Sequence, residues 1–323
     1  MKSILLFDTS IATLNTGDEI INVSLRKNWP EIYKNNYIMT FPTHTPTFYW
    51  WQNLLMKKNK IYANADLKFL CGTNILYTNM LRPEPAWNVF VTNTEIAKNT
   101  ICVGAGIGIN SKKTTFYTKL LYRKILSLKY IHSVRDEKTK DFLESLGYKA
   151  VNTGCPTLWG LTPEFCQFIP TRKSDRVICT LTSYEADRIN DQRMIDILLK
   201  NYKEVFFWPQ SIGDVEYIKT LKNTENVKIV APNLKAYDKI LNTEIDYVGN
   251  RLHGGIFAMQ HKCRSIIISI DYRAKEMSET YSFACISRES IEAELDEKIN
   301  AEWGTRIEGL DFSKIEQWKR QFE

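Results

Sequence analysis

An arginine, a histidine and two glycines follow one another where a predicted strand gives way to a helix. The strand covers 246–248, and the helical pattern begins at Arg251, followed by His253, Gly254 and Gly255. A helix N-terminus presents free backbone N–H groups and a partial positive charge, which suit a phosphate or a carboxylate. The guanidinium can hold such an anion through two hydrogen bonds, and the imidazole can transfer a proton near neutral pH. This junction therefore predicts an anion site with an acid–base group.

The same residues also have a structural interpretation. Arg251 would then form a salt bridge across the surface, and His253 would be a half-buried imidazole with satisfied hydrogen bonds. For a single histidine this interpretation is the better one. An arginine and a histidine beside paired glycines at the end of a strand favour function, because glycine removes side-chain bulk where a ligand could approach.

The first predicted strand leads into a second polar junction. Asn15 could donate or accept a hydrogen bond from the loop, and Gly17 permits a tight turn. Asp18 is well placed to cap the following helix. Simple capping explains Asp18 as well as a role in binding substrate does, and both interpretations stay open.

Two further cations follow predicted strands. Arg135 follows the strand at 130–134 and could point toward a ligand, with Asp136 in the first turn of the next helix. A purely structural role explains this junction equally well, and both interpretations stay open. Lys275 follows the strand at 265–270 and could reach the same pocket as the histidine. For Lys275 the alternative is an exposed lysine at the start of a helix.

Glycine-containing turns follow two other strands. One contains Gly72, Thr73 and Asn74, and the other is the Gly-Ala-Gly-Ile-Gly run at 104–108. The second run has no third glycine at the spacing of a dinucleotide-binding fingerprint and no acidic residue about twenty positions downstream, so we exclude NAD binding. Both are interpreted as tight turns beneath the ligand site, with exposed amides that could meet an anion.

Metal, disulfide and hydrolase chemistry find no support in the spacing of residues. The four histidines have no ligand spacing with cysteines or acids, and neither a GxSxG elbow nor a P-loop is present. The seven cysteines include no CxxC pair and mostly lie in apolar surroundings, which is typical of small buried hydrophobes. We expect no metal and no redox cofactor.

Length and charge limit the class of protein. A chain of 323 residues suggests about two domains of ~150 residues. The net charge of +6 is too small and too dispersed for a nucleic-acid footprint, but is compatible with an anionic substrate or an anionic membrane surface. Neither a signal-peptide pattern nor an apolar stretch of ~20 residues is found, so a cytoplasmic location is expected.

Short apolar runs alternate with helical patterns along almost the whole chain. The runs that predict strands are 3–7, 37–41, 67–71, 100–103, 130–134, 149–152, 177–181, 205–208, 227–230, 246–248 and 265–270. The helical patterns are 18–28, 46–58, 114–128, 136–146, 187–202, 212–222, 234–242, 251–261, 290–300 and 312–322. Such alternation predicts parallel sheets with both faces covered, and prolines 156, 163 and 170 mark a linker between two doubly wound α/β domains.

Together these junctions resemble the polysaccharide pyruvyltransferase family. The resemblance extends from about residue 8 to residue 277. It rests on Asn-Thr-Gly-Asp at 15–18, Val-Arg-Asp at 134–136, Leu143, Leu146-Gly147, Cys155-Pro156, Trp-Pro-Gln at 208–210, Arg-Leu-His-Gly at 251–254, Asp271 and Lys275.

The resemblance implies an α/β fold of two Rossmann-like domains facing across a cleft, as in GT-B glycosyltransferases. Residues 1–165 would form the N-terminal, acceptor-side domain. Residues 171–323 would form the donor-side domain, whose last helix is free to pack back on the first domain. The activity implied is transfer of pyruvate from phosphoenolpyruvate to two hydroxyls of a sugar, which forms a cyclic ketal.

The resemblance also assigns roles to the residues of the junctions. Donor-binding residues would be Arg251, Leu252, Gly254, Arg135 and Lys275, and acceptor-binding residues would be Asn15, Gly17, Gly72, Thr73 and Asn74. His253 is the candidate general acid–base, and Asp18 is the candidate for activating the acceptor hydroxyl. Ketal formation needs proton transfer and cations for a carboxylate and a phosphate, which these residue types supply without a cofactor.

The acceptor would be an intermediate of exopolysaccharide or capsule assembly, and such intermediates are often lipid-linked. The basic stretch 119–129 could then rest on the inner face of a membrane, although a helix packed on the sheet with a solvated basic face is the stronger interpretation. Two other functions remain open. One is a GT-B glycosyltransferase that uses a nucleotide sugar, and the other is a non-catalytic protein of polysaccharide assembly.

Overall fold

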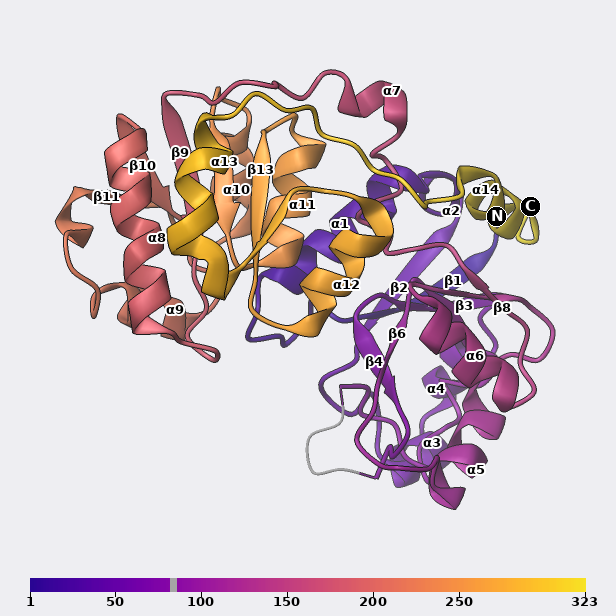
Figure 1. The fold of residues 1–323 in the computed structure, drawn as a ribbon. Coiled ribbons are helices and arrows are strands. Elements are labelled where there is room, and N and C mark those ends of the chain that lie inside the picture. Colours follow the sequence, from indigo (N-terminus) through magenta and orange to yellow (C-terminus); the bar gives the residue numbers. More distant parts are fainter. Residues whose placement is uncertain (82–85) are drawn as a thin grey trace. The chain divides into compact units, whose positions relative to one another are not determined.

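The computed structural model describes residues 1–81 and 86–323, without the side chains at positions 50, 53, 54, 57, 58, 272 and 273. The described chain divides into two compact units (Figure 1). Unit 1 contains residues 1–13, 21–159 and 311–323, and unit 2 contains residues 14–20 and 160–310. No helix within the described ranges is long and apolar enough to cross a bilayer.

Unit 1 is built on a parallel sheet in the order β2-β1-β3-β5. Its strands are β1 (Ser3–Asp8), β2 (Tyr37–Pro42), β3 (Leu67–Cys71) and β5 (Ile101–Val103). A bridge from Ala105 to Val134 leads on to a parallel pair, β7 (His132–Val134) and β8 (Ala150–Asn152). Taken together, the sequence of neighbours is that of flavodoxin-like folds, in which the chain order reverses between the first and third strands.

Beyond the ends of β3 and β5, a second small parallel pair forms from β4 (Asn74–Tyr77) and β6 (Gly106–Gly108). The helices of unit 1 are α2 (Glu31–Lys34), α3 (Trp50–Leu55), α4 (Lys57–Ala63), α5 (Phe116–Ile125), α6 (Glu137–Ser145), α14 (Phe312–Arg320) and most of α1 (Gly17–Asn28). Helix α5 buries Leu121, Tyr122 and Ile125 in the core, which explains its amphipathic pattern.

Unit 2 contains six parallel strands in the order β11-β10-β9-β12-β13-β14. They are β9 (Arg176–Thr180), β10 (Glu204–Phe207), β11 (Val227–Ile229), β12 (Asp246–Gly249), β13 (Ser265–Ser269) and β14 (Cys285–Ser287). This is the 3-2-1-4-5-6 order of a dinucleotide-binding Rossmann fold. Strand β13 is buried along its whole length, as a central parallel strand covered on both faces must be.

Helices cover both faces of this sheet. They are α8 (Arg188–Asn201), α9 (Ile212–Ile218), α10 (Leu234–Leu241), α11 (Leu252–Gln260), α12 (Tyr272–Tyr281) and α13 (Asp296–Asn300), with the short α7 (Pro163–Cys166) before the first strand. Helices α8 and α13 contact each other on one face (Figure 1). Gly255 of α11 packs closely on Tyr247 and Ile267. Because side chains alternate along a strand, these two residues lie on the face of the sheet opposite to α8 and α13.

The chain does not divide into the two units at a single linker, because two segments belong to the unit other than the one expected from their position in the sequence. The C-terminal helix α14 belongs to unit 1, where Trp318 packs 5.0 Å from the ring of Trp29 and donates a hydrogen bond to Ile131 O. Residues 14–20 belong to unit 2, because Thr16 N and Oγ1 both bond to Gln210 O, at 3.0 and 3.1 Å.

Candidate functional site

The predicted arginine lies at the point where the strand order of unit 2 reverses. Strands β9 and β12 are neighbours there, and ligands of Rossmann folds bind outside the carboxyl ends of such a strand pair. A Cβ built at Gly249 would lie 2.3 Å from Thr180 Oγ1, so the glycine allows the two strand ends to approach. Arg251, two residues later, is the N-cap of α11.

A closed ring of hydrogen bonds holds the main chain of Arg251. Its N–H donates to Thr180 Oγ1 at 3.2 Å, and its carbonyl accepts from Tyr247 Oη at 2.8 Å. The hydroxyls of Thr180 and Tyr247 lie 2.6 Å apart, and Thr180 is the donor because Tyr247 has already given its proton. Burial raises the pKa of Tyr247, so its hydroxyl stays a donor across the physiological range.

The Arg251 side chain forms an ion pair in the interior of unit 2. Its Nη2 lies 2.5 Å from Asp214 Oδ2, and the two side chains are 6% and 0% exposed. Asp214 also accepts hydrogen bonds from the backbone N–H groups of Ser183, Gln210 and Ser211 at 3.0–3.1 Å. Arg251 therefore forms a salt bridge, as the structural interpretation of the sequence predicted, but the pair is buried and not on the surface. A buried, fully bonded carboxylate of this kind fixes the direction of the guanidinium.

Only part of the guanidinium is used by this pair. Its central carbon lies 5.1 Å from the ring centre of Tyr184, and the buried Nε has no hydrogen-bond partner among the described residues. Helix α11 has no side-chain cap at its N-terminus, whereas Asp187 and Asn233 cap α8 and α10 in the same unit. Arg251 thus combines an unused donor with an uncapped helix N-terminus, which is a favourable environment for an anion.

The side chain of Gln210 separates the starts of two helices. A Cβ at Gly17 of α1 would lie 2.8 Å from Gln210 Oε1, and a Cβ at Gly254 of α11 would lie 2.8 Å from Gln210 Nε2. Each glycine thus leaves room for this amide in its present position. This contact brings the Asn15–Asp18 junction to the residues around Arg251.

Several buried polar atoms without partners lie at this edge of the sheet. Among the described residues they include Gln210 Nε2, both amide atoms of Asn250, Thr182 Oγ1 and Arg251 Nε. Buried polar atoms almost always have partners in native proteins, because each unpaired one costs free energy. Their position after the ends of β9, β10 and β12 indicates a polar ligand site at this edge.

The remaining residues predicted near Arg251 are placed as follows. Leu252 and His253 lie half-buried in the first turn of α11, and Gly254 is buried beside Gln210. Lys275 is exposed on α12, which is the simpler of the two interpretations of that lysine.

In unit 1, the structure brings Arg135 together with the two glycine turns. A Cβ at Gly106 would lie 2.5 Å from Arg135 Nε and 2.7 Å from Asn74 Oδ1, so the guanidinium lies against the bare backbone of the glycine. Arg135 Nε also pairs with Asp136 at 3.3 Å, and the Arg135 side chain is 14% exposed. Asn74 Oδ1 is buried and has no hydrogen-bond partner in the described chain.

The turns beneath Arg135 have left-handed backbone conformations. Gly72, Thr73 and Gly104 have φ of +61°, +57° and +60°. Gly106 N donates to Thr73 O at 2.8 Å, which ties the two turns together. Arg135 was grouped in the sequence with the donor residues, but it lies in unit 1 with the turns assigned to the acceptor. Asn15 and Asp18, expected on the N-terminal side, lie in unit 2.

Sequence reasoning missed Asp214, Tyr184 and the central role of Gln210. The signal for Asp214 was its position three residues after Ser211, which is the spacing of a capping box, and that motif is present at the start of α9. The ion pair with Arg251 joins residues 37 positions apart, which no local pattern predicts.

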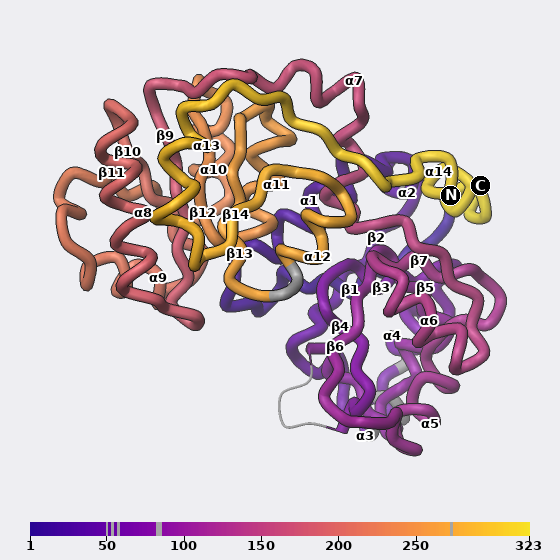
Figure 2. Tube along the Cα trace, viewed as in Figure 1, coloured from indigo at the N-terminus to yellow at the C-terminus, as the bar shows by residue number. Residues whose placement is uncertain are grey.

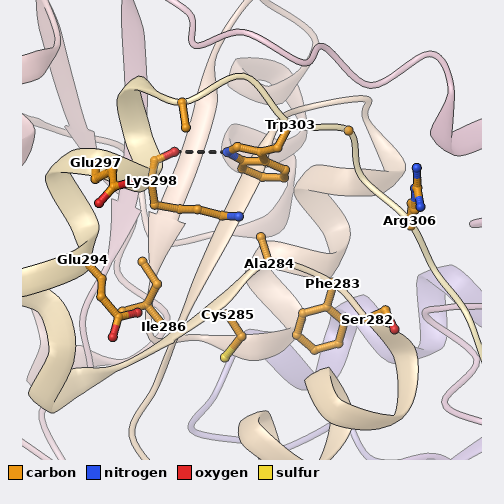
Figure 3. A pocket seen from close by; sticks show the side chains of 12 residues that line it. Ser282, Phe283, Ala284, Cys285, Ile286, Glu294, Glu297, Lys298, Trp303 and Arg306 are labelled. Atoms are coloured by element: carbon orange, nitrogen blue, oxygen red, sulfur yellow. Dashed lines mark hydrogen bonds between the residues drawn. The ribbon is translucent and has the colours of Figure 1, made fainter.

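Unit 2 also contains a pocket of about 560 Å³ away from these residues (Figure 3). It lies beside the edge strand β14, and the half-buried indole of Trp303 donates a hydrogen bond to Lys298 O at 3.0 Å. Glu294, Glu297 and Arg306 also line it. None of the predicted site residues is among its lining residues, so the strand-end site and this pocket are separate.

Comparison with known proteins identifies the family of the chain. A family model described as polysaccharide pyruvyl transferase matches residues 15–272, a range that contains all the predicted site residues except Lys275. The chain belongs to the polysaccharide pyruvyl transferase family. Membership makes it a transferase of polysaccharide pyruvylation, and the resemblance seen in the sequence is confirmed. No curated protein matches the chain.

Solved structures confirm the expected fold class. UDP-GlcNAc 2-epimerase of Methanocaldococcus jannaschii, crystallised with UDP-GlcNAc and UDP, matches with a TM-score of 0.54 at 15% identity over 99% of both chains. The epimerase of Neisseria meningitidis matches with a TM-score of 0.49 at 12% identity, over 99% of this chain and 100% of that chain. At 15% identity the likeness to the Methanocaldococcus jannaschii enzyme concerns the fold alone. This pyruvyl transferase family member has two Rossmann-like domains of the GT-B-like class.

Proposed function

We propose that this protein transfers pyruvate from phosphoenolpyruvate to two hydroxyls of a sugar and releases phosphate. The observation that supports this donor is the environment of Arg251, where a guanidinium with an unused buried donor lies at the uncapped N-terminus of α11. A donor with a carboxylate and a phosphate would use both the guanidinium and the backbone amides.

The reaction begins with a proton on the methylene carbon of the enol phosphate, which leaves positive charge on the adjacent carbon. His253 is proposed as the acid that supplies this proton. One sugar hydroxyl attacks that carbon and loses its proton, phosphate departs, and the second hydroxyl closes the ketal ring and loses its proton. Arg251 is proposed to stabilise the charge on the carboxylate and the phosphate, with Lys275 as a second candidate cation of the same unit. Arg135 is the proposed anion ligand of unit 1. No metal or redox cofactor is needed for these steps.

The acceptor is proposed to be a saccharide intermediate of exopolysaccharide or capsule assembly, linked to a lipid at the cytoplasmic face of a membrane. Asp18 is the proposed base for the acceptor hydroxyl. Asn15 and Gly17 are the proposed acceptor-binding residues of unit 2, and Gly72, Thr73 and Asn74 are those of unit 1. The segment 15–18 contacts Gln210 in unit 2 through Thr16 and Gly17. A sugar hydroxyl bound by this segment would therefore be activated close to Arg251.

Calorimetric titration of phosphoenolpyruvate tests the donor, with UDP as the second ligand. We expect wild type to bind phosphoenolpyruvate, and Arg251→Lys to bind it at least about tenfold more weakly because lysine keeps the charge for Asp214 but loses the planar fork. His253→Ala should bind the donor but lose turnover of phosphoenolpyruvate to phosphate with a saccharide acceptor. The matched control is His261→Ala, at the other end of the same helix, where the imidazole contacts Phe257 O and Asp238.

The other outcomes lead to different functions. Binding of UDP without phosphoenolpyruvate would favour a glycosyltransferase that uses a nucleotide sugar. Binding of neither ligand, together with a stable complex with another assembly protein, would favour a non-catalytic role. Near-full activity of a folded His253→Ala variant would remove the histidine from the mechanism.

A further inference from the structure

Two segments of unit 1 contain basic residues and no acidic ones. Between residues 43 and 65 the charged residues are Lys57, Lys58 and Lys60. Between residues 109 and 131 they are Lys112, Lys113, Lys119, Arg123, Lys124 and Lys129. These cations outnumber the net charge of +6 of the whole chain, so the rest of the chain carries a net negative charge.

The fold brings the two segments to one end of unit 1. Phe48, just before α3, lines a small pocket with Trp87 and Val89. Two residues after Val89, the backbone N–H of Val91 donates a hydrogen bond to Tyr117 Oη of α5 at 3.4 Å. Residues 87–91 therefore contact both segments, and the trace in Figure 2 has α3 and α5 at the same end of the unit.

Large apolar side chains are exposed among these cations. Tyr49 and Trp51 are 59% and 47% exposed, and their rings are parallel with centres 6.5 Å apart. Leu55 is 72% exposed. On α5, Phe116 and Leu120 are exposed one turn apart.

The exposed face of α5 combines these apolar side chains with cations. Lys119, Arg123 and Lys124 are exposed beside Phe116 and Leu120, whereas the opposite face of the helix is buried in the core. Apolar and aromatic side chains next to lysine and arginine are the pattern of helices that lie in the headgroup region of an anionic bilayer. We name this end of unit 1, defined by Tyr49, Trp51, Leu55, Phe116, Lys119, Leu120, Arg123 and Lys124, the basic apolar face.

We propose that the basic apolar face binds the surface of a bilayer that contains anionic lipid. The cations attract the headgroups, and the exposed aromatic and aliphatic side chains enter the boundary between headgroups and acyl chains. A nucleic acid would use the cations and the aromatic rings, but it offers nothing to Leu55 and Leu120. The proposal rests on the surface of unit 1 alone and does not require the proposed donor chemistry.

Co-sedimentation of the full chain with vesicles tests the proposal, using phosphatidylcholine with and without 30% phosphatidylserine at about 0.1 M salt. Wild type should bind the anionic vesicles, bind pure phosphatidylcholine at least about tenfold less, and lose affinity as salt is raised. The double variant Phe116→Ser with Leu120→Ser changes no charge and should lower binding about tenfold or more. Lys119→Glu with Arg123→Glu should do the same.

Matched controls lie on the exposed surface of unit 2. Lys222→Glu with Lys235→Glu makes the same charge change, and Ile229→Ser removes an exposed apolar side chain, so neither should alter vesicle binding. Circular dichroism of each variant should match wild type. Lipids brominated on the acyl chain should quench tryptophan emission in wild type and quench it less in Trp51→Phe.

Three results would overturn the proposal. One is the absence of binding to anionic vesicles at about 0.1 M salt. Another is equal loss of binding in the controls of unit 2. The third is salt-sensitive binding that survives Phe116→Ser with Leu120→Ser and is matched by binding to single-stranded DNA, because a polyanion site would then explain the cations. Since no donor or acceptor is present in these assays, their outcome is independent of the proposed transfer reaction.

Discussion

The strand ends of the two units are shaped by different parts of the polypeptide. In unit 1, the surface beneath Arg135 is main chain, with left-handed turns at Gly72, Thr73 and Gly104 and no side chain at Gly106. In unit 2, the corresponding edge is made by buried side chains, among them the Asp214–Arg251 pair and the amide of Gln210. Unit 1 therefore depends on backbone conformations that only a few residues adopt, and unit 2 depends on pairing of polar groups.

The largest effect is expected for Asp214→Ala, which tests the edge of the unit 2 sheet that is made by buried side chains. It leaves the buried Arg251 guanidinium without its counter-ion and three backbone N–H groups without their acceptor. We expect a loss of about 3–5 kcal/mol in the free energy of unfolding, measured by urea denaturation. Asp238→Ala is the control, since its carboxylate is 52% exposed and should matter by less than about 1 kcal/mol. Equal losses of unfolding free energy in Asp214→Ala and Asp238→Ala would show that unit 2 does not depend on its buried ion pair.

The backbone-built edge of unit 1 is tested by Gly104→Ala. The residue has φ of +60°, and its Cβ would lie 2.2 Å from Pro156 Cδ. The left-handed conformation costs about 1–2 kcal/mol and the overlap about 1–3 kcal/mol more. Gly147→Ala is the matched control, because φ is +89° but nothing lies within 4 Å of the new Cβ. Thermal and urea unfolding should separate the two, and equal stability would show that Pro156 moves aside freely.

The dependence of stability on pH tests His132, whose imidazole is hydrogen-bonded to the backbone of unit 1. His132 Nδ1 accepts from Cys102 N–H at 3.1 Å, so Nε2 carries the proton and donates to Ser127 O at 2.8 Å. Burial lowers the pKa of His132 to about 4. Because the unfolded chain takes up this proton near pH 6.5, the contribution of His132 is present above that pH and is lost as the pH falls toward 4.

The slope of unfolding free energy between pH 6.5 and 4 should therefore be steeper in wild type than in His132→Gln, by up to about 1.4 kcal/mol per pH unit. Urea unfolding at several pH values measures it. His44→Gln is the control. Parallel slopes in wild type and His132→Gln would mean that the imidazole is protonated without cost in the folded protein.

The smallest expected effect concerns the amide between the two helix starts of unit 2. Gly17→Ala and Gly254→Ala would each press on the same flexible side chain, so each should cost less than about 1.5 kcal/mol. The two changes should not add, because one displacement of Gln210 relieves both contacts. Replacing Gln210 by alanine should make both glycine substitutions nearly neutral in urea unfolding. Strict additivity would show that the contacts are relieved separately.

Sequence patterns were sufficient for most strands, since buried parallel strands are short apolar runs between turns. Strands β4, β6 and β14 and helix α12 were not predicted. Strands β4 and β6 begin within the segments interpreted as tight turns, β14 is only three residues long, and α12 is polar along most of its length. The single helix expected at 46–58 is two helices, because Met56 has an extended backbone conformation between them.

The candidate site was predictable where it depends on a local junction and not where it depends on contacts between distant residues. Arg251 and the glycines beside it follow a strand, and that pattern is visible in the sequence. The contact of Thr16 with Gln210 joins residues 194 positions apart, and it moves the Asn15–Asp18 junction into the other unit. Such long-range contacts are decided by packing, which periodicity and turn signals do not encode.

Helix α1 has a consequence for how this protein can be recombined with its relatives. The helix is divided, with residues up to 20 in unit 2 and the remainder in unit 1, and the chain passes between units again near residues 160 and 310. A chimera joined at a single crossover in the linker would take Thr16 from one parent and Gln210 from the other. Unit 2 is therefore inherited as two separate stretches, 14–20 and 160–310, and a chimera that exchanges this unit between family members must transplant both.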